Sequence, residues 1–285
     1  MTTERERPVR IVALDLDGTL LKADQTIGER TQKALIDAMK SGVNIVIATG
    51  RPYVALPDAI KNIEGVEYAI TANGGRIVKL HSGECIHSTP IKEETARKLL
   101  SWFRTLPYMI EVHTGGGAYI DCHSLDDPGR HGIKDGSIEY LRRSRKEVPD
   151  LYEFAFERVS EIENINFHFG DQEAKKKMWE ELDKFDDLYV TSSFDRLLEI
   201  SNVNASKGKA IYALADILGV DYSDTMACGD GLNDLAMLEA AGVAVAMGNG
   251  KPEVKEAADF ITLDNEKDGV GIAIEKFALM KEIDI

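Results

Sequence analysis

The chain has 285 residues, 44% hydrophobic and 29% charged, which is typical of a water-soluble globular protein with one large or two modest domains. Its 34 basic and 49 acidic residues give a net charge of −15, which argues against general binding to nucleic acid or to an anionic membrane. An anionic small molecule is not excluded, because a metal ion and a few cationic side chains can reverse the field locally.

The cysteines and the N-terminal stretch indicate a reducing compartment. Cys85, Cys122 and Cys228 cannot all pair, and none of them lies in a CxxC motif. Residues 1–10 are charged and lack the apolar segment of a signal peptide, and no apolar run approaches the roughly 18 residues of a membrane span. We therefore expect a cytoplasmic protein without a membrane partner.

The first part of the chain predicts alternating strands and helices, which is typical of a parallel sheet covered by helices. The apolar patterns predict a strand at 9–16, a helix at 28–41, a strand at 43–48, a helix over about 53–63, a strand at 67–70 and a short strand at 76–80.

The pattern changes between about residues 84 and 193, where strand pairs with helices between them predict a separate α+β layer. The expected elements there are a helix near 91–105, strands at 108–114 and 117–122, a basic helix near 132–146, a strand at 163–169, a helix at 171–185 and a strand at 188–193.

The alternation of strands and helices then resumes. We expect strands at 197–201, 225–229, 243–247 and 259–262, and helices at 206–218, 232–240, 252–257 and from 269 onward. The simplest organisation is a discontinuous α/β domain of residues 1–83 and 194–285, interrupted by an inserted domain of residues 84–193.

Two carboxylates follow the first apolar strand in the run Asp15-Leu16-Asp17-Gly18. Residues i and i+2 of an extended backbone point to the same face, so both acids can converge on one point. Such close carboxylates repel each other unless a proton or a cation lies between them. The pattern therefore predicts a divalent metal site in which one carboxylate is free to act as a nucleophile.

Two further clusters combine donors with the ends of predicted strands. Thr49-Gly50-Arg51 follows the strand at 43–48, where a hydroxyl and backbone N–H groups are natural phosphate ligands, although a plain helix N-cap is the alternative. Lys207 opens the helix after the strand at 197–201, where its charge opposes the helix dipole unless an anion or a carboxylate lies nearby. A solvated surface lysine is the other interpretation.

The fourth cluster is Gly229-Asp230-Gly231-Leu232-Asn233-Asp234, between a predicted strand and helix. Asp230 and Asp234 are four residues apart and share a face at a helix start. The GxG pattern does not predict a dinucleotide site, because Asp234 stands where the third glycine belongs and would repel a pyrophosphate. Every cluster follows a predicted strand of the parallel sheet, so all four are expected at one edge of that sheet.

The motifs DLDGTL, ATGR, the lysine of NASKGKA and GDGLND, in this order, resemble the four motifs of the haloacid dehalogenase superfamily. The long insertion between ATGR and the lysine is similar to that of its Cof-like phosphatases, which carry an α/β cap there (subclass IIB). The resemblance covers nearly the whole chain and implies a Rossmann-like parallel-sheet core with an inserted cap. Asn204 is a local departure, since such sequences often have glycine there.

The resemblance implies roles for the motif residues. Asp15 would be the nucleophile that becomes an aspartyl-phosphate, and Asp17 the general acid and base. The cofactor would be Mg²⁺, held by Asp15, the backbone carbonyl of Asp17 and Asp230, with Asp234 supporting through water or from the second shell. The phosphoryl oxygens would be bound by Thr49, Gly50, Lys207, Asn233 and Gly18.

The partner implied is a small phosphate ester, with sugar phosphates as the first expectation and no nucleic acid. A phosphomutase on the same scaffold and a phospho-acceptor signalling module are the alternatives. Arg51 is expected either to touch substrate or to cap its turn and pair with a carboxylate. The inserted domain would select the leaving group, but its polar residues favour a structural or solvated role over substrate contact: His113, His123, His131 and the basic run Arg142, Arg143, Arg145 and Lys146.

Overall fold

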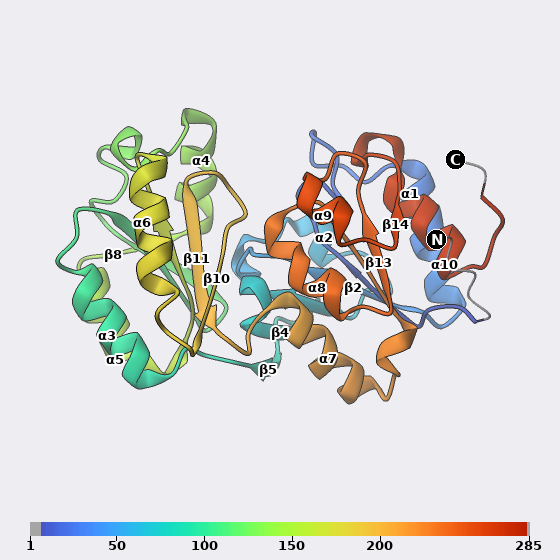
Figure 1. The fold of residues 1–285 in the computed structure, drawn as a ribbon, viewed down its shortest axis with the longest axis horizontal. Coiled ribbons are helices and arrows are strands. Elements are labelled where there is room, and N and C mark those ends of the chain that lie inside the picture. The colour runs from blue at the N-terminus through green and yellow to red at the C-terminus, as the bar shows by residue number, and fades with distance from the viewer. Residues whose placement is uncertain (1–6, 284–285) are drawn as a thin grey trace.

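A computed structural model describes residues 7–283 of the chain. The chain forms two sheets that lie side by side along the longest axis of the molecule, each with its own helices (Figure 1). We call the eight-stranded sheet the main sheet and the six-stranded sheet the cap sheet.

The main sheet is parallel at its centre and carries an antiparallel edge. Its strand order is β14-β13-β12-β1-β2-β3-β4-β5, and only β4 and β5 run antiparallel to their neighbours. The strands are β1 (Ile11–Leu14), β2 (Asn44–Ala48), β3 (Tyr68–Thr71), β4 (Arg76–Lys79), β5 (Cys85–Ser88), β12 (Thr225–Gly229), β13 (Val243–Ala246) and β14 (Phe260–Ile261).

Both faces of the main sheet are covered, which explains why its central strands are continuous apolar runs. In β1, Val12 and Leu14 belong to the hydrophobic core under α1 (Glu29–Lys40) and α10 (Gly269–Phe277). Ile11 and Ala13 belong to the core under α7 (Lys207–Leu218) and α8 (Leu235–Ala240). The remaining helices of this part are α2 (Asp58–Lys61) and α9 (Pro252–Glu256).

The cap sheet has one apolar and one polar face. Its order is β10-β11-β9-β6-β7-β8, antiparallel except for the pair β7–β8. Its apolar face packs under α3 (Glu93–Phe103), α5 (Leu151–Glu157) and α6 (Gln172–Leu182), whereas α4 (Asp135–Ser144) packs against the opposite face. The strands are β6 (Met109–Thr114), β7 (Gly117–Asp121), β8 (Lys146–Val148), β9 (Ile162–His168), β10 (Leu188–Thr191) and β11 (Leu197–Asn202).

The α/β fold with a parallel-sheet core is confirmed, but two expected boundaries do not match the division of the sheets. The strand expected at 197–201 in the parallel sheet is β11, which pairs antiparallel with β9 and β10 of the cap sheet. Its alternation of polar Glu199 and Ser201 with apolar neighbours is the period of a sheet with one polar face. Residues 85–88, expected in the inserted domain, form β5 of the main sheet.

The helix expected over 53–63 is also interrupted. It splits into a 3₁₀ turn (Tyr53–Ala55) and the short α2, separated at Pro57, whose ring cannot continue a helix. The basic helix expected to reach residue 146 ends at Ser144, and residues 146–148 form β8. Helix α5 was not expected.

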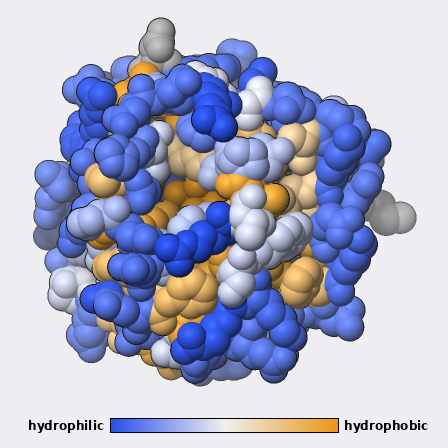
Figure 2. Space-filling model, turned by 90° about the vertical axis from the view of Figure 1, so that its left-hand side faces the viewer, coloured by the Kyte–Doolittle hydropathy of each residue, from blue (hydrophilic) through white to orange (hydrophobic). Residues whose placement is uncertain are grey.

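None of the helices within residues 7–283 has the length and apolarity that a membrane crossing requires. Residues 1–6, part of the stretch considered as a signal peptide, lie outside the described residues. Viewed from the cap side, the surface is mainly hydrophilic, with hydrophobic side chains visible in the recesses between polar ones (Figure 2).

Candidate active site

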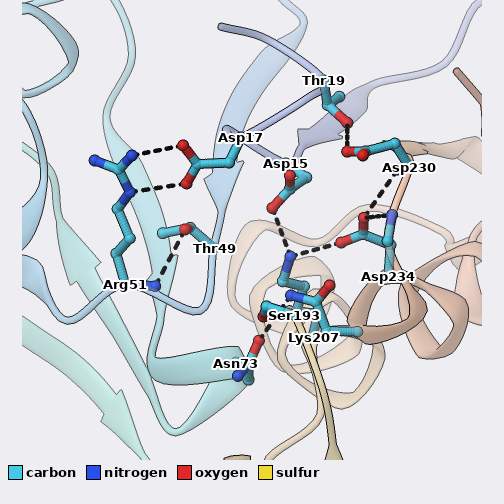
Figure 3. Close-up of polar contacts among 12 residues, drawn as sticks. Asp15, Asp17, Thr19, Thr49, Arg51, Asn73, Ser193, Lys207, Asp230 and Asp234 are labelled. Carbon is cyan, nitrogen blue, oxygen red and sulfur yellow. Dashed lines mark hydrogen bonds and ion pairs between the residues drawn. The ribbon is translucent and has the colours of Figure 1, made fainter. Parts of the chain in front are cut away.

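Four loops meet at the carboxyl ends of three adjacent strands. The strands β12, β1 and β2 are neighbours in the main sheet, and Asp15 follows β1 as Thr49 follows β2 and Asp230 follows β12. Lys207 is the first residue of α7 and reaches the same edge although its preceding strand is in the cap sheet. The structure therefore brings the four sequence clusters together at one point (Figure 3).

Lys207 is the centre of this cluster. Its ammonium is fully buried and donates to Asp15 Oδ1 at 2.7 Å and to Asp234 Oδ1 at 2.6 Å. Burial opposes its charge, but the two carboxylates outweigh burial and raise the pKa of Lys207. The interpretation as a solvated surface lysine is wrong.

Three carboxylates remain crowded around this one ammonium. Burial, followed by repulsion from Asp234, raises the pKa of Asp15 well above its ordinary value, with Lys207 opposing. Burial and Asp234 also raise the pKa of Asp230 to about 6. Both raised pKa values mean that the charged carboxylates are poorly stabilised here, so a further positive charge would be favourable at the site.

Asp15, Asp230 and Asp234 each offer one oxygen, and these oxygens lie within 4.8 Å of one another. An all-oxygen set of carboxylates is the donor chemistry that Mg²⁺ prefers. Asp230 Oδ1 is oriented by the hydroxyl of Thr19, which donates to it at 2.8 Å. The residues present therefore fit a hard divalent cation.

Asp234 shapes the loop as well as adding charge. Its Oδ2 accepts the backbone N–H groups of Asp230 and Gly231, both at 2.9 Å, while its Oδ1 is bonded to Lys207. Because its oxygens are already engaged, Asp234 is better suited to orienting Asp230 and Lys207 than to binding a metal directly.

Asp17 points away from Lys207 and is held by Arg51. The guanidinium donates from Nε to one oxygen of Asp17 at 2.8 Å and from Nη2 to the other at 2.5 Å (Figure 3). Of the two interpretations of Arg51, the structure has it pair with a carboxylate. Gly18 follows with a φ of +82°, and a side chain there would lie 2.5 Å from Asp230, so this position requires glycine.

A chain of polar side chains links the loop after β12 to the cap sheet. Asn233 Nδ2 donates to Asn73 Oδ1 at 3.2 Å, and Asn73 Nδ2 donates to Glu199 Oε1 at 2.8 Å. The backbone N–H of Ser193 donates to Glu199 Oε2 at 2.7 Å. Gly50 lies against this chain: a Cβ at this position would be 2.8 Å from Glu199 Oε1.

A cleft of about 300 Å³ lies between the two sheets, lined by residues of both. Its floor is formed by residues that follow β1, β2 and β12 of the main sheet, and the cap contributes Tyr140, Arg145, Asn166, Ser193, Phe194, Leu197 and Glu199.

Most of the cap residues in the cleft were not found from the sequence. Arg145 was expected on a solvated helix face, but its side chain is 7% exposed and pairs with buried Glu111 at 2.7 Å. Glu199 had a detectable signal, since an acid in an alternating strand marks a polar face, whereas Tyr140 and Asn166 had none. The other polar cap residues were expected to be structural or solvated, and their exposure agrees with this. His113 is buried, His123 is 80% exposed, His131 is half-buried, and Arg142, Arg143 and Lys146 are exposed.

Comparisons with known proteins agree with this arrangement. The sequence model of the family described as haloacid dehalogenase-like hydrolase matches residues 12–274. Phosphatase YwpJ of Bacillus subtilis is 31% identical over 278 residues, covering 92% of this chain and 97% of that protein. The 5-amino-6-(5-phospho-D-ribitylamino)uracil phosphatase YcsE of the same organism is 29% identical over 286 residues, covering 98% and 100%.

A solved structure is similar as well. A haloacid dehalogenase-like hydrolase from B. subtilis superposes with a TM-score of 0.81 at 31% identity, covering 93% of this chain and 99% of that one.

Proposed function

Because this chain belongs to the haloacid dehalogenase superfamily and is a phosphatase of its Cof-like group, we propose that it hydrolyses small phosphomonoesters with Mg²⁺ through an aspartyl-phosphate on Asp15. Sugar phosphates are the substrates we expect first. The relative YcsE, named for a phosphate carried on a ribityl chain, supports a hydroxylated leaving group.

The observation that carries this proposal is the buried Asp15–Lys207–Asp234 ion-pair cluster opening into the cleft. Lys207 fixes one oxygen of Asp15 and leaves the other for attack on phosphorus. In this proposal the ammonium also neutralises a phosphoryl oxygen, and phosphoryl transfer depends mainly on such positioning and charge neutralisation.

Mg²⁺ would be held by Asp15, Asp230 and the backbone carbonyl of Asp17, with Asp234 supporting from behind. When bound, it would neutralise the developing charge on the phosphoryl group. Burial and repulsion from Asp234 raise the pKa of Asp230 to about 6. A bound cation would stabilise the charged carboxylate against both effects, which supports this assignment. The phosphoryl oxygens would be bound by Thr49, Gly50, Lys207, Asn233 and Gly18.

The reaction would proceed in two displacements. Asp15 attacks phosphorus, the bond to the leaving oxygen breaks, and Asp17 donates a proton to that oxygen. Asp17 then takes a proton from the water that attacks the phosphorus, which frees phosphate and restores Asp15. Both oxygens of Asp17 are bonded to Arg51 here, so Arg51 must release at least one of them before Asp17 reaches the leaving group.

We assign the cap sheet and its helices as the domain that closes over the site and selects the leaving group. Its support is the polar chain from Asn233 through Asn73 to Glu199, which holds the cap against the catalytic loops. Because β11 pairs within the cap sheet and β5 within the main sheet, we assign the inserted domain to about residues 90–202, where the sequence led us to expect 84–193.

Phosphate release from a panel of sugar phosphates, nucleotides and phosphorylated cofactors tests the proposal, with Mg²⁺ and with EDTA. We expect Mg²⁺-dependent release that Asp15→Asn abolishes and that the exposed control Asp186→Asn retains. Release that persists in Asp15→Asn would refute the nucleophile. A stable phosphorylated Asp15 without phosphate release would instead favour a mutase or a phospho-acceptor.

A further inference from the structure

A second cavity of about 610 Å³ adjoins the catalytic cleft. The two share Tyr140, Arg145, Ser193, Phe194 and Leu197, so they adjoin at these cap residues. The catalytic cleft of about 300 Å³ is at the lower end of ligand pockets, which span about 300–1,000 Å³. The adjoining space therefore permits a leaving group larger than a single sugar.

Phe194 lines both cavities and is 64% exposed, more than any other large hydrophobic side chain within residues 7–283. It lies in the loop between β10 and β11, next to Ser193, whose N–H is bonded to Glu199. Its ring is thus available at the point where a leaving group would pass from one cavity to the other.

A buried ammonium fixes the loop that presents Phe194. Lys175 of α6 is 9% exposed and bonds Ser192 Oγ at 2.6 Å, the Phe194 carbonyl at 3.2 Å and the Asp195 carbonyl at 3.0 Å. All three acceptors are uncharged, so burial is the main influence on this lysine and lowers its pKa. Burying an ammonium against neutral oxygens is costly, and its effect here is to hold one loop conformation.

The rest of the larger cavity combines apolar side chains with unpaired cations. Ile133, Leu141 and Leu197 are buried residues in its lining. Lys134 and Lys251 also line it, and within residues 7–283 neither side chain has an ion pair or hydrogen bond. Apolar walls with ammonium groups favour a flat ring that carries oxygen or nitrogen acceptors.

The ring of Tyr140 lines both cavities. The Arg51 and Arg145 guanidinium carbons lie 5.4 and 5.2 Å from its centroid, on a side chain that lines both spaces. Arg145 is itself held by Glu111, so these aromatic and planar groups are fixed before any ligand arrives.

We propose that the larger cavity is a leaving-group subsite for a planar heterocyclic ring, which stacks on Phe194 while the phosphate lies at Asp15. This inference rests on the proposed phosphatase function and deepens it: the preferred substrates carry a ring beyond the hydroxylated group that bears the phosphate. A bare sugar phosphate fills only the catalytic cleft.

The matched substrates are ribose 5-phosphate and uridine 5′-monophosphate, which share the phosphorylated ribose and differ in the base. We expect kcat/KM for the nucleotide to exceed that for the sugar phosphate by about tenfold, the order of one base stacked on an aromatic side chain. Phe194→Ala and Phe194→Leu should bring the ratio close to one, whereas Phe194→Tyr should retain it.

Two further variants separate stacking from a general loss of structure. Lys175→Met should lower the ratio, because the loop is no longer fixed. Tyr222→Ala removes an exposed aromatic side chain outside both cavities and should leave the ratio unchanged. A ratio near one in the wild type, or a ratio insensitive to Phe194→Ala, would overturn the subsite.

Failure of the subsite and failure of the phosphatase proposal give different results. If the wild type hydrolyses both compounds equally, only the subsite is wrong. If neither is hydrolysed, calorimetric binding to Asp15→Asn decides: tighter binding of the nucleotide, lost with Phe194→Ala, supports the subsite, and equal or undetectable binding refutes it.

Discussion

Replacing Lys207 with methionine tests the centre of the site most directly. The ammonium is fully buried and lies 2.7 Å from an oxygen of Asp15 and 2.6 Å from an oxygen of Asp234. At an effective dielectric constant of about 20, each contact is a Coulomb attraction of roughly 6 kcal/mol. The desolvation of the lysine offsets much of this, so we expect a net loss of about 3–5 kcal/mol in the free energy of unfolding.

The loss should depend on pH. Lys207 is the group that opposes the raised pKa of Asp15, so its removal raises that pKa further. A carboxyl group whose pKa is higher in the folded than in the unfolded state binds more protons when folded, and stability then falls as pH rises through that interval. The slope is about 1.4 kcal/mol per pH unit for each extra proton. Lys207→Met should therefore be less destabilised at pH 5 than at pH 8.

Urea unfolding of wild type and variant at both pH values, with EDTA present, measures the difference. Lys209→Met is the matched control, because Lys209 lies two residues further along α7 and is exposed. A loss below about 1 kcal/mol in Lys207→Met, equal at both pH values, would refute the view that Lys207 holds two buried carboxylates together.

Three other changes test separate parts of the site. Since the pKa of Asp230 without metal is about 6, with burial as the main cause, protons should compete with Mg²⁺ below that pH; calorimetry at pH 5 and 7.5 should show weaker binding at pH 5, and equal affinities would contradict this. Glu111→Gln leaves the Arg145 guanidinium buried without its countercharge and should lower the urea unfolding free energy by about 3–5 kcal/mol; an unchanged value would mean that the pair contributes nothing. Gly50→Ala places a Cβ 2.8 Å from Glu199 Oε1 and should raise KM. The double variant with Glu199→Ala should have a lower KM than Gly50→Ala alone, and an equal KM in the two would contradict this clash.

Much of the main sheet and of the candidate site at its carboxyl edge could be predicted from the sequence. The continuous apolar runs at residues 11–14 and 225–229 are buried on both faces, so they identified parallel strands, and the polar residues at their ends had to meet at one edge. The family motifs then identified Asp15, Thr49, Lys207 and Asp230, which the structure does bring together. These features are local in sequence, because each depends on one strand and the turn that follows it.

The neighbours of these residues depend on contacts between distant segments. Residues 197–201 form a strand as predicted, but only pairing with β9 and β10 decided that the strand belongs to the cap sheet. The same pairing turns Glu199 toward Asn73, 126 positions away in the chain, and sets it above Gly50. The alternating pattern of β11 indicates which of its faces is buried. It does not indicate which strands pair with β11, because β9 and β10 are separate segments of the chain.

The sequence by itself determined which chemical groups could form the site: two carboxylates at the end of a buried strand, a lysine at a helix start, and an acidic loop. Parallel topology brings the two carboxylates and the acidic loop to one sheet edge, whereas Lys207 follows a strand of the cap sheet. The tertiary structure decided what surrounds them. It paired Arg51 with Asp17, buried Arg145 against Glu111, and opened a second cavity beside the first. The reason is physical: backbone geometry fixes where a strand ends, but which side chains face each other across a cleft depends on how the two sheets pack together.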